Sequence, residues 1–103
     1  MESKKNEGAF SRESILKDLL AVLEDITLDW DLEFDGSIGP HTRLIADLAF
    51  ESVDVVQFVV AIEEQFKCRG LSWEEFLMKD GRYVDEIKVG DTVDFLYKKL
   101  NNY

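Results

Sequence analysis

The spacing of the apolar residues constrains the fold of this chain more than any other feature. From Ser11 to about Thr27, apolar side chains recur every three or four positions, which is the period of an amphipathic helix. A second helix is predicted from Ser52 to about Phe66, with Gly70 beyond it as a stop signal, and a last helix is introduced by Gly90. Strand-like alternation is missing along the chain. The spacing therefore predicts an all-α fold.

The segments outside these helices predict how the helices are connected. Residues 1–10 are expected to form a disordered tail, which leaves residues 11–103 as one domain. A long loop that contains glycine and proline joins the first two helices. Farther along, Leu71–Met78 predicts a short helix, the Asp80-Gly81 pair predicts a turn, and Tyr83–Ile87 is a candidate for another single turn. The expected architecture is a bundle of three main helices and one or two short ones, with a long first loop.

The helix that begins at Ser52 has two apolar sides. On a helical wheel the larger stripe, which should face the core, consists of Val55, Phe58, Val59, Ile62 and Phe66. The second stripe lies nearly opposite and consists of Val53, Val56 and Val60, with Gln57, Glu63 and Glu64 beside it. A small domain cannot easily bury both sides of one helix. The second stripe is therefore either covered by the long loop or the short third helix, or it meets another molecule.

Ser52 has two interpretations at the start of this helix. Serine is a common N-cap, but a capping box on Ser52 would need Glu or Gln three residues later, where this chain has Val55. The functional interpretation is a phosphodiester on the serine oxygen, because an anion is favoured at the positive end of the helix dipole.

The composition argues against several classes of function. Twelve basic residues against 22 acidic ones give a net charge of −10, which argues against binding to nucleic acid or to an anionic membrane and favours partners with basic patches. Cys68 and His41 are the only residues of their types, so we expect no intrachain disulfide, no thiolate metal site and no nucleophilic triad. No apolar run reaches membrane-spanning length and no targeting signal opens the chain, so a cytoplasmic protein is expected.

The segment Leu44–Phe66 strongly resembles the acyl carrier protein family. That family shows an apolar pair, an Asp-Leu, a short gap and then Asp-Ser-Leu at the start of its second helix, which typically ends in an acidic pair close to a phenylalanine. The matching segments of this chain are Asp47-Leu48, Glu51-Ser52-Val53 and Glu63-Glu64-Gln65-Phe66. The stretch Val89–Leu96 also resembles the start of the family's fourth helix, so the resemblance covers most of residues 11–100.

The resemblance implies an acyl-carrier-like bundle and a covalent 4'-phosphopantetheine arm on Ser52. The thiol of that arm, not Cys68, would carry acyl intermediates as thioesters for enzymes of fatty acid, lipid or polyketide biosynthesis. The implied partners are a phosphopantetheinyl transferase and acyl-loading and acyl-transfer enzymes with basic docking patches, and the carrier itself is expected to be a monomer without catalytic residues. The residues that match the family's docking surface are Glu51, Val53, Asp54, Val56, Gln57, Val60, Glu63 and Glu64.

This chain departs from the family pattern in a few places. Glu51 replaces the usual Asp and Val53 the usual Leu, while Gln57 stands where family members often have an acid. The segment Leu71–Ile87 is longer than in a minimal carrier, and Trp30 is a further addition. These departures indicate a specialised member dedicated to one pathway.

Other interpretations remain open beside the carrier. Asp31–Ile38 resembles the first eight positions of a calcium-binding EF-hand loop, but Thr42 stands at position 12, where calcium needs a bidentate Glu, and Pro40 stands at position 10. An adaptor subunit could keep the same fold without a cargo. A peptidyl carrier usually has Gly-Gly where this chain has Ala49-Phe50. An enzyme is the least favoured interpretation, because the chain has one histidine, one cysteine and no glycine-rich phosphate loop.

Overall fold

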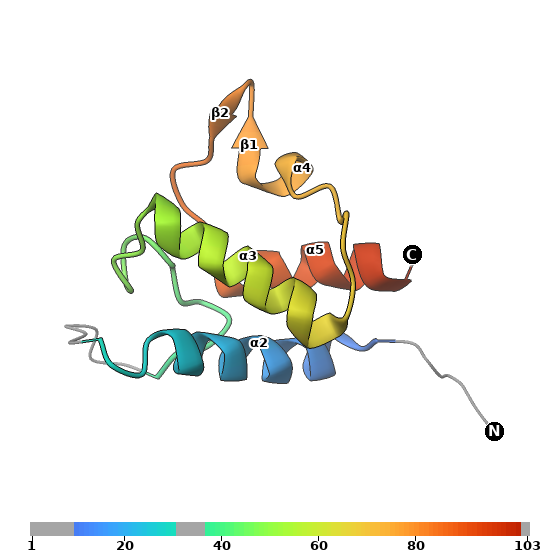
Figure 1. Ribbon diagram of the computed structural model, residues 1–103, viewed down its shortest axis with the longest axis horizontal. Coiled ribbons are helices and arrows are strands. Elements are labelled where there is room, and N and C mark those ends of the chain that lie inside the picture. Colours follow the sequence, from blue (N-terminus) through green and yellow to red (C-terminus); the bar gives the residue numbers. More distant parts are fainter. Residues whose placement is uncertain (1–9, 31–36, 102–103) are drawn as a thin grey trace.

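Three long helices form most of the protein. The structure is a computed structural model that describes residues 10–30 and 37–101 (Figure 1). Within these residues the long helices are α2 (Arg12–Ile26), α3 (Ser52–Phe66) and α5 (Val89–Asn101). The expected helical bundle, with three main helices and a long loop between the first two, is confirmed.

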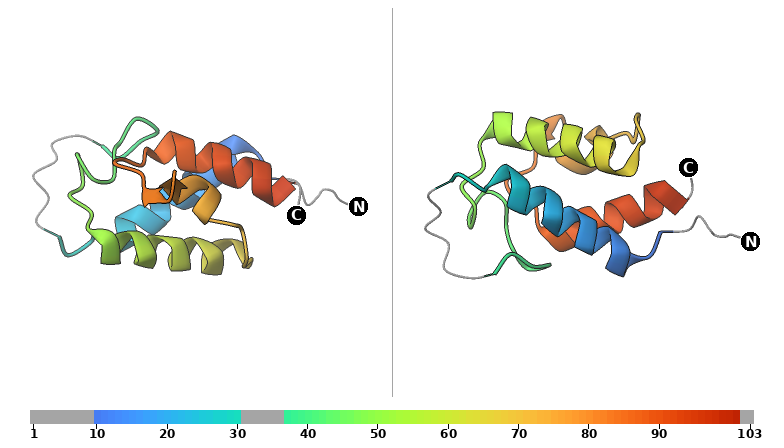
Figure 2. Two further views of the ribbon diagram at one scale, coloured as in Figure 1. Left: turned by 90° about the horizontal axis from the view of Figure 1, so that it is seen from above. Right: turned by 60° about the horizontal axis from the view of Figure 1, so that its bottom comes forward.

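A small insertion separates α3 from α5. It contains a four-residue helix, α4 (Glu74–Leu77), and a hairpin made of β1 (Met78–Lys79) and β2 (Arg82–Tyr83). In Figure 1, α2 lies along one side of the domain and the hairpin projects from the opposite side, with α3 and α5 between them. Seen from above, α4 and the hairpin lie over the space between α3 and α5 (Figure 2). None of the helices in the described residues is both long and apolar enough to cross a membrane.

The boundaries of α2 follow from its end residues. The Ser11 hydroxyl accepts a hydrogen bond from the Ser14 N–H at 3.1 Å, and the Ser14 hydroxyl accepts one from the Ser11 N–H at 3.3 Å. This reciprocal cap satisfies two N–H groups that have no partner within the helix. At the other end, the Thr27 hydroxyl donates to the Leu23 carbonyl at 2.8 Å. The predicted helix from a Ser11 cap to about Thr27 is confirmed.

The core lies where α2 packs against α3 and α5. It is built of apolar side chains from all three helices and from the loop before α3; those that are fully buried include Ile15, Leu19, Leu23, Leu44, Leu48, Ile62 and Leu96. Of the stripe that α3 was predicted to turn inward, Phe58, Ile62 and Phe66 are buried, whereas Val55 and Val59 are half-buried. The core-facing side of α3 is therefore the predicted one. Phe10, just before α2, packs edge-on against Phe66 at 5.8 Å between ring centroids.

The insertion differs from the sequence-based prediction in two places. The predicted short helix over Leu71–Met78 is only the single turn of α4, because Met78 already begins β1. The expected helical turn over Tyr83–Ile87 is wrong: Tyr83 belongs to β2, and the Val84 N–H donates to the Leu77 carbonyl at 2.9 Å. Pairing across the hairpin to residues 77–79 keeps residues 82–84 out of a helical conformation. The predicted turn at Asp80-Gly81 is present and joins the two strands, with positive φ at both residues.

Two truncations on α3 test this assignment of its faces. Ile62 is fully buried and Val56 is 59% exposed. Ile62→Ala is expected to lower the free energy of unfolding by about 2–5 kcal/mol, because it removes buried methyl groups and leaves a cavity. Val56→Ala should change it by less than about 0.5 kcal/mol. Urea denaturation of both variants measures the difference, and equal losses would contradict the assignment.

Candidate functional site

Ser52 is the first residue of α3 and is exposed to solvent. The N-cap position belongs to Glu51, whose N–H donates to Asp54 Oδ2 at 2.8 Å. The interpretation of Ser52 as the N-cap is therefore wrong, because the carboxylate of Asp54 closes the start of the helix one residue earlier than a serine cap would. Among the described residues, the Ser52 hydroxyl has no hydrogen-bond partner. The hydroxyl is accessible from solvent.

The start of α3 also provides an environment that suits an anion. The N–H groups of Asp54 and Val55 donate to the Glu51 carbonyl, at 2.9 and 3.1 Å. The N–H groups of Ser52 and Val53 have no acceptor within the described residues. Unpaired N–H groups at the positive end of a helix dipole stabilise negative charge nearby. A phosphodiester on the Ser52 oxygen would lie next to them.

Backbone pairing holds the loop that leads into Ser52. Hydrogen bonds join this loop to the segment before α5 and to the first residues of that helix: Gly90 N–H to Pro40 O at 2.9 Å, Val89 N–H to Thr42 O at 3.0 Å, and Leu44 N–H to Ile87 O at 2.9 Å. The loop then turns back on itself, and the Phe50 N–H donates to the Leu44 carbonyl at 3.0 Å. Three side chains of the loop, Leu44, Leu48 and Phe50, are buried in the core. The position of Ser52 is thus determined by both backbone pairing and core packing.

Arg43 and Asp47 form an ion pair within this loop. Arg43 Nη2 lies 2.9 Å from Asp47 Oδ1, and the Arg43 N–H donates to Asp47 Oδ2 at 2.8 Å. The hydrogen bond from the Arg43 side chain, followed by the one from its backbone, lowers the pKa of Asp47. The side-chain hydrogen bond to Asp47, followed by the negative charge of Asp47, raises the pKa of Arg43. Asp47 therefore stabilises the turn before Ser52.

Three valines on α3 are exposed, and we call Val53, Val56 and Val60 the valine face. Their exposed fractions are 59%, 59% and 49%. Of the two possibilities left open by the sequence, burial under the loop or α4 is excluded for the described residues. A contiguous row of exposed apolar side chains on one helix is typical of an interaction surface.

The polar residues predicted to flank the valine face fall into two groups. Glu51, Gln57 and Glu64 are exposed. Asp54 and Glu63 are half-buried and already have partners, since Asp54 accepts from Glu51 and Glu63 Oε2 accepts from Trp73 Nε1 at 3.2 Å. Negative charge next to the valine face is therefore most accessible at Glu51 and Glu64.

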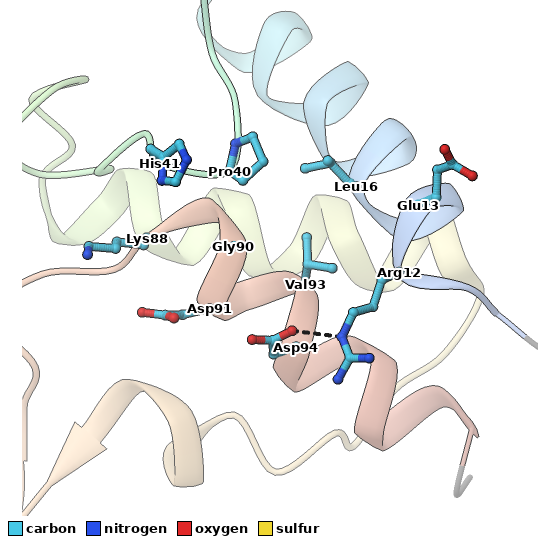
Figure 3. A pocket seen from close by; sticks show the side chains of 10 residues that line it. All are labelled: Arg12, Glu13, Leu16, Pro40, His41, Lys88, Gly90, Asp91, Val93 and Asp94. Atoms are coloured by element: carbon cyan, nitrogen blue, oxygen red, sulfur yellow. Dashed lines mark hydrogen bonds and ion pairs between the residues drawn. The ribbon is translucent and has the colours of Figure 1, made fainter.

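A pocket of about 540 Å³ lies elsewhere in the domain, between the starts of α2 and α5 (Figure 3). It is lined by residues of α2 and α5 and by Pro40, His41 and Lys88, and by none of α3. Its charges largely compensate one another: Arg12 Nε lies 2.9 Å from Asp94 Oδ1, and the Arg12 guanidinium also stacks over the Tyr97 ring. This pocket is separate from the Ser52 site.

Cys68 does not contribute a reactive group. Its side chain is buried in the core just after α3. Burial, followed by the nearby charge of Glu63, raises the pKa of the Cys68 thiol. A buried thiol with a raised pKa is a poor nucleophile.

Most of the calcium-loop candidate, Asp31–Ile38, lies outside the described residues, because the structure does not describe residues 31–36. Across residues 10–30 and 37–101, no three histidine, cysteine or acidic side chains are grouped as metal ligands.

The pH dependence of stability tests the role of Asp47. Because its pKa is lower in the folded protein than in the unfolded chain, where it is about 3.9, the stabilisation is present above that pH and is lost as the pH falls through the folded value. Asp47→Asn should therefore unfold at lower urea concentration than the wild type at pH 7, and this difference should shrink below about pH 4.

Asp29→Asn is the matched control, because Asp29 is exposed and has no ion pair within the described residues. Its stability relative to the wild type should not vary with pH in this way. A deficit of Asp47→Asn that stays constant down to about pH 3 would contradict the assignment.

Comparison with protein-family models, with curated proteins and with solved structures finds no significant match for this chain.

Proposed function

We propose that this protein is an acyl carrier in which the Ser52 hydroxyl is the attachment point for a 4'-phosphopantetheine arm. The observation that carries the proposal is the state of Ser52: an exposed hydroxyl with no partner among the described residues, at the start of a helix that has an exposed apolar face. The sequence around it, Asp47-Leu48 followed by Glu51-Ser52-Val53, resembles that of acyl carrier proteins. The local geometry and the sequence resemblance both support Ser52 as the attachment point.

The residues present fit the attached group. In the attachment reaction, Ser52 Oγ would form a bond to the pantetheine-side phosphorus of coenzyme A, the phosphoanhydride bond would break, adenosine 3',5'-bisphosphate would leave, and the serine proton would pass to a base of the transferase. The new phosphodiester anion would be stabilised by the unpaired N–H groups of Ser52 and Val53. When bound, the arm supplies the terminal thiol that holds an acyl group as a thioester. This chain contributes the attachment point and the surface that partners recognise.

The valine face with Glu51 and Glu64 supports docking to a partner that combines an apolar patch with basic residues. Exposed acids accelerate encounter with a basic surface, and the apolar centre contributes most of the affinity. A carrier has to leave each enzyme after transfer, so a small docking surface suits it. The arm then increases the effective concentration of the cargo at each partner.

The first test is modification of Ser52. The protein and a Ser52→Ala variant are incubated with coenzyme A, magnesium and a broad-specificity phosphopantetheinyl transferase, and intact mass is recorded. The wild type should gain one phosphopantetheine and Ser52→Ala none. Ser72→Ala is a control that should be modified like the wild type, because Ser72 lies outside α3. Failure of the folded wild type with two unrelated transferases would refute the proposal and leave an adaptor that binds through the valine face.

The second test addresses docking. Val56→Thr keeps the shape of the side chain but makes the centre of the valine face polar, so the KM for the transferase should rise by about fivefold or more, as expected for loss of a central contact. Leu28→Thr is the matched control, because Leu28 is 76% exposed and lies beyond α2. Circular dichroism should be unchanged in both variants. An equal KM for the two variants would argue against docking through this face.

A further inference from the structure

Glu86, which precedes α5, accepts three backbone hydrogen bonds through its carboxylate. Oε2 accepts from the Ile45 N–H at 2.8 Å and from the Ile87 N–H at 3.0 Å, and Oε1 accepts from the Ala46 N–H at 2.9 Å. Two of these donors are about forty residues away in the sequence and belong to the loop that leads into α3. Nothing in the resemblance to carrier proteins or in the docking surface assigns a role to Glu86.

The donors lie at the start of a helical turn. In that turn the Asp47 N–H donates to the Arg43 carbonyl at 3.0 Å, and the Ala49 N–H donates to the Ile45 carbonyl at 3.1 Å. The N–H groups at the beginning of such a turn have no acceptor within it, and a carboxylate placed there acts as a cap and complements the local dipole. Hydrogen bonds to an ionised carboxylate are also stronger than neutral ones. Glu86 thus caps a turn in another part of the chain.

This turn is connected rigidly to Ser52. After Leu48, which is fully buried, Ala49 adopts a left-handed backbone with φ of 59°, and the Phe50 N–H closes back on Leu44. Glu51 and Ser52 follow directly. The Arg43–Asp47 ion pair lies within the turn and would move with it, whereas Glu86 connects the turn to the segment before α5. Loss of the Glu86 carboxylate would therefore remove the two bonds that hold the Ile45 and Ala46 end of the turn against this segment, while the Leu44–Ile87 bond and the internal bonds of the turn remain.

We infer that Glu86 is a positioning residue for Ser52: it holds the 43–48 turn, and through it the start of α3, in the arrangement that a phosphopantetheinyl transferase recognises. This inference rests on the proposed carrier function. Glu86 need not touch the transferase or coenzyme A. Without it, only a fraction of the molecules would present Ser52 correctly, and apparent affinity falls in proportion to that fraction.

The test combines kinetics with hydrogen exchange. In Glu86→Gln, one carboxylate oxygen becomes an amide that cannot accept from a facing N–H group. We expect the KM for the transferase to rise by about fivefold or more while kcat stays within about twofold. Amide exchange at Ile45 and Ala46 should accelerate by about tenfold or more, with the amides in the middle of α5 unchanged.

Asp85→Asn is the matched control. It removes the same charge from the neighbouring residue, which is exposed and has no hydrogen bond within the described residues. Its KM and its exchange rates should equal those of the wild type. An equal rise of KM in both variants would show that net charge, not the cap, matters, and would overturn the inference.

The remaining outcomes are distinguishable. If the wild type is not modified at all, the proposed function fails, whereas exchange at Ile45 and Ala46 still tests the cap. If Glu86→Gln exchanges rapidly at these amides but is modified with an unchanged KM, the positioning role is refuted and the carrier function stands. If Glu86→Gln does not fold, the wild type alone decides the cap: Ile45 and Ala46 should exchange as slowly as Asp47 and Leu48, and rapid exchange there would overturn the inference.

Discussion

The hydrogen bonds between residues 40–44 and 87–90 connect the loop before α3 to the start of α5, and the rest of the site depends on this connection. Without it, the loop between α2 and α3 would be long enough to place the start of α3 in many positions. With this pairing in place, Leu44, Leu48 and Phe50 face the core, where all three are buried. Phe50 is buried two residues before Ser52, and Glu51 and Ser52 are both exposed.

The acidic residues of this protein serve two different purposes. Asp47, Asp54 and Glu86 accept hydrogen bonds from backbone N–H groups around the start of α3. Glu51 and Glu64 instead remain exposed beside the valine face. The net charge of the chain is −10, but some of the acidic side chains already stabilise turns and helix ends. Those side chains are therefore less available for docking to a partner. Other exposed acids, such as Glu24 and Asp85, lie away from α3.

The insertion between α3 and α5 explains why the valine face stays uncovered. Phe76 stacks on Phe95 of α5 at 4.9 Å between centroids, and Trp73 lies 5.0 Å from the same ring. Lys99 Nζ adds an ion pair with Glu75 Oε1 at 2.9 Å. These contacts hold α4 on α5, and a hydrogen bond from Trp73 to Glu63 also connects it to α3. Because the aromatic side chains of this segment pack against Phe95 of α5, α4 does not cover Val53, Val56 and Val60.

The sequence by itself determined the features that depend on near neighbours. Helical spacing and the Ser11 cap predicted α2, and the two-sided pattern of Ser52–Phe66 predicted α3, the burial of Ile62 and a second apolar stripe. The prediction of Ser52 at the start of that helix needed no tertiary information. Each of these follows from residues within one or two helical turns, where the backbone period relates sequence to space.

Only the tertiary structure decided the features that join distant segments. The N-cap of α3 is Glu51, which pairs with Asp54 three residues later, a local signal that the prediction centred on Ser52 omitted. α3 ends at Phe66 as predicted, and Lys67 just after it is left-handed. The pairing of β2 with β1 and the bonds from Ile45 and Ala46 to Glu86 link residues that helical periodicity cannot relate. Whether the valine face would be covered depended on where α4 packs. Such contacts depend on the packing of the whole chain, so no local pattern could specify them.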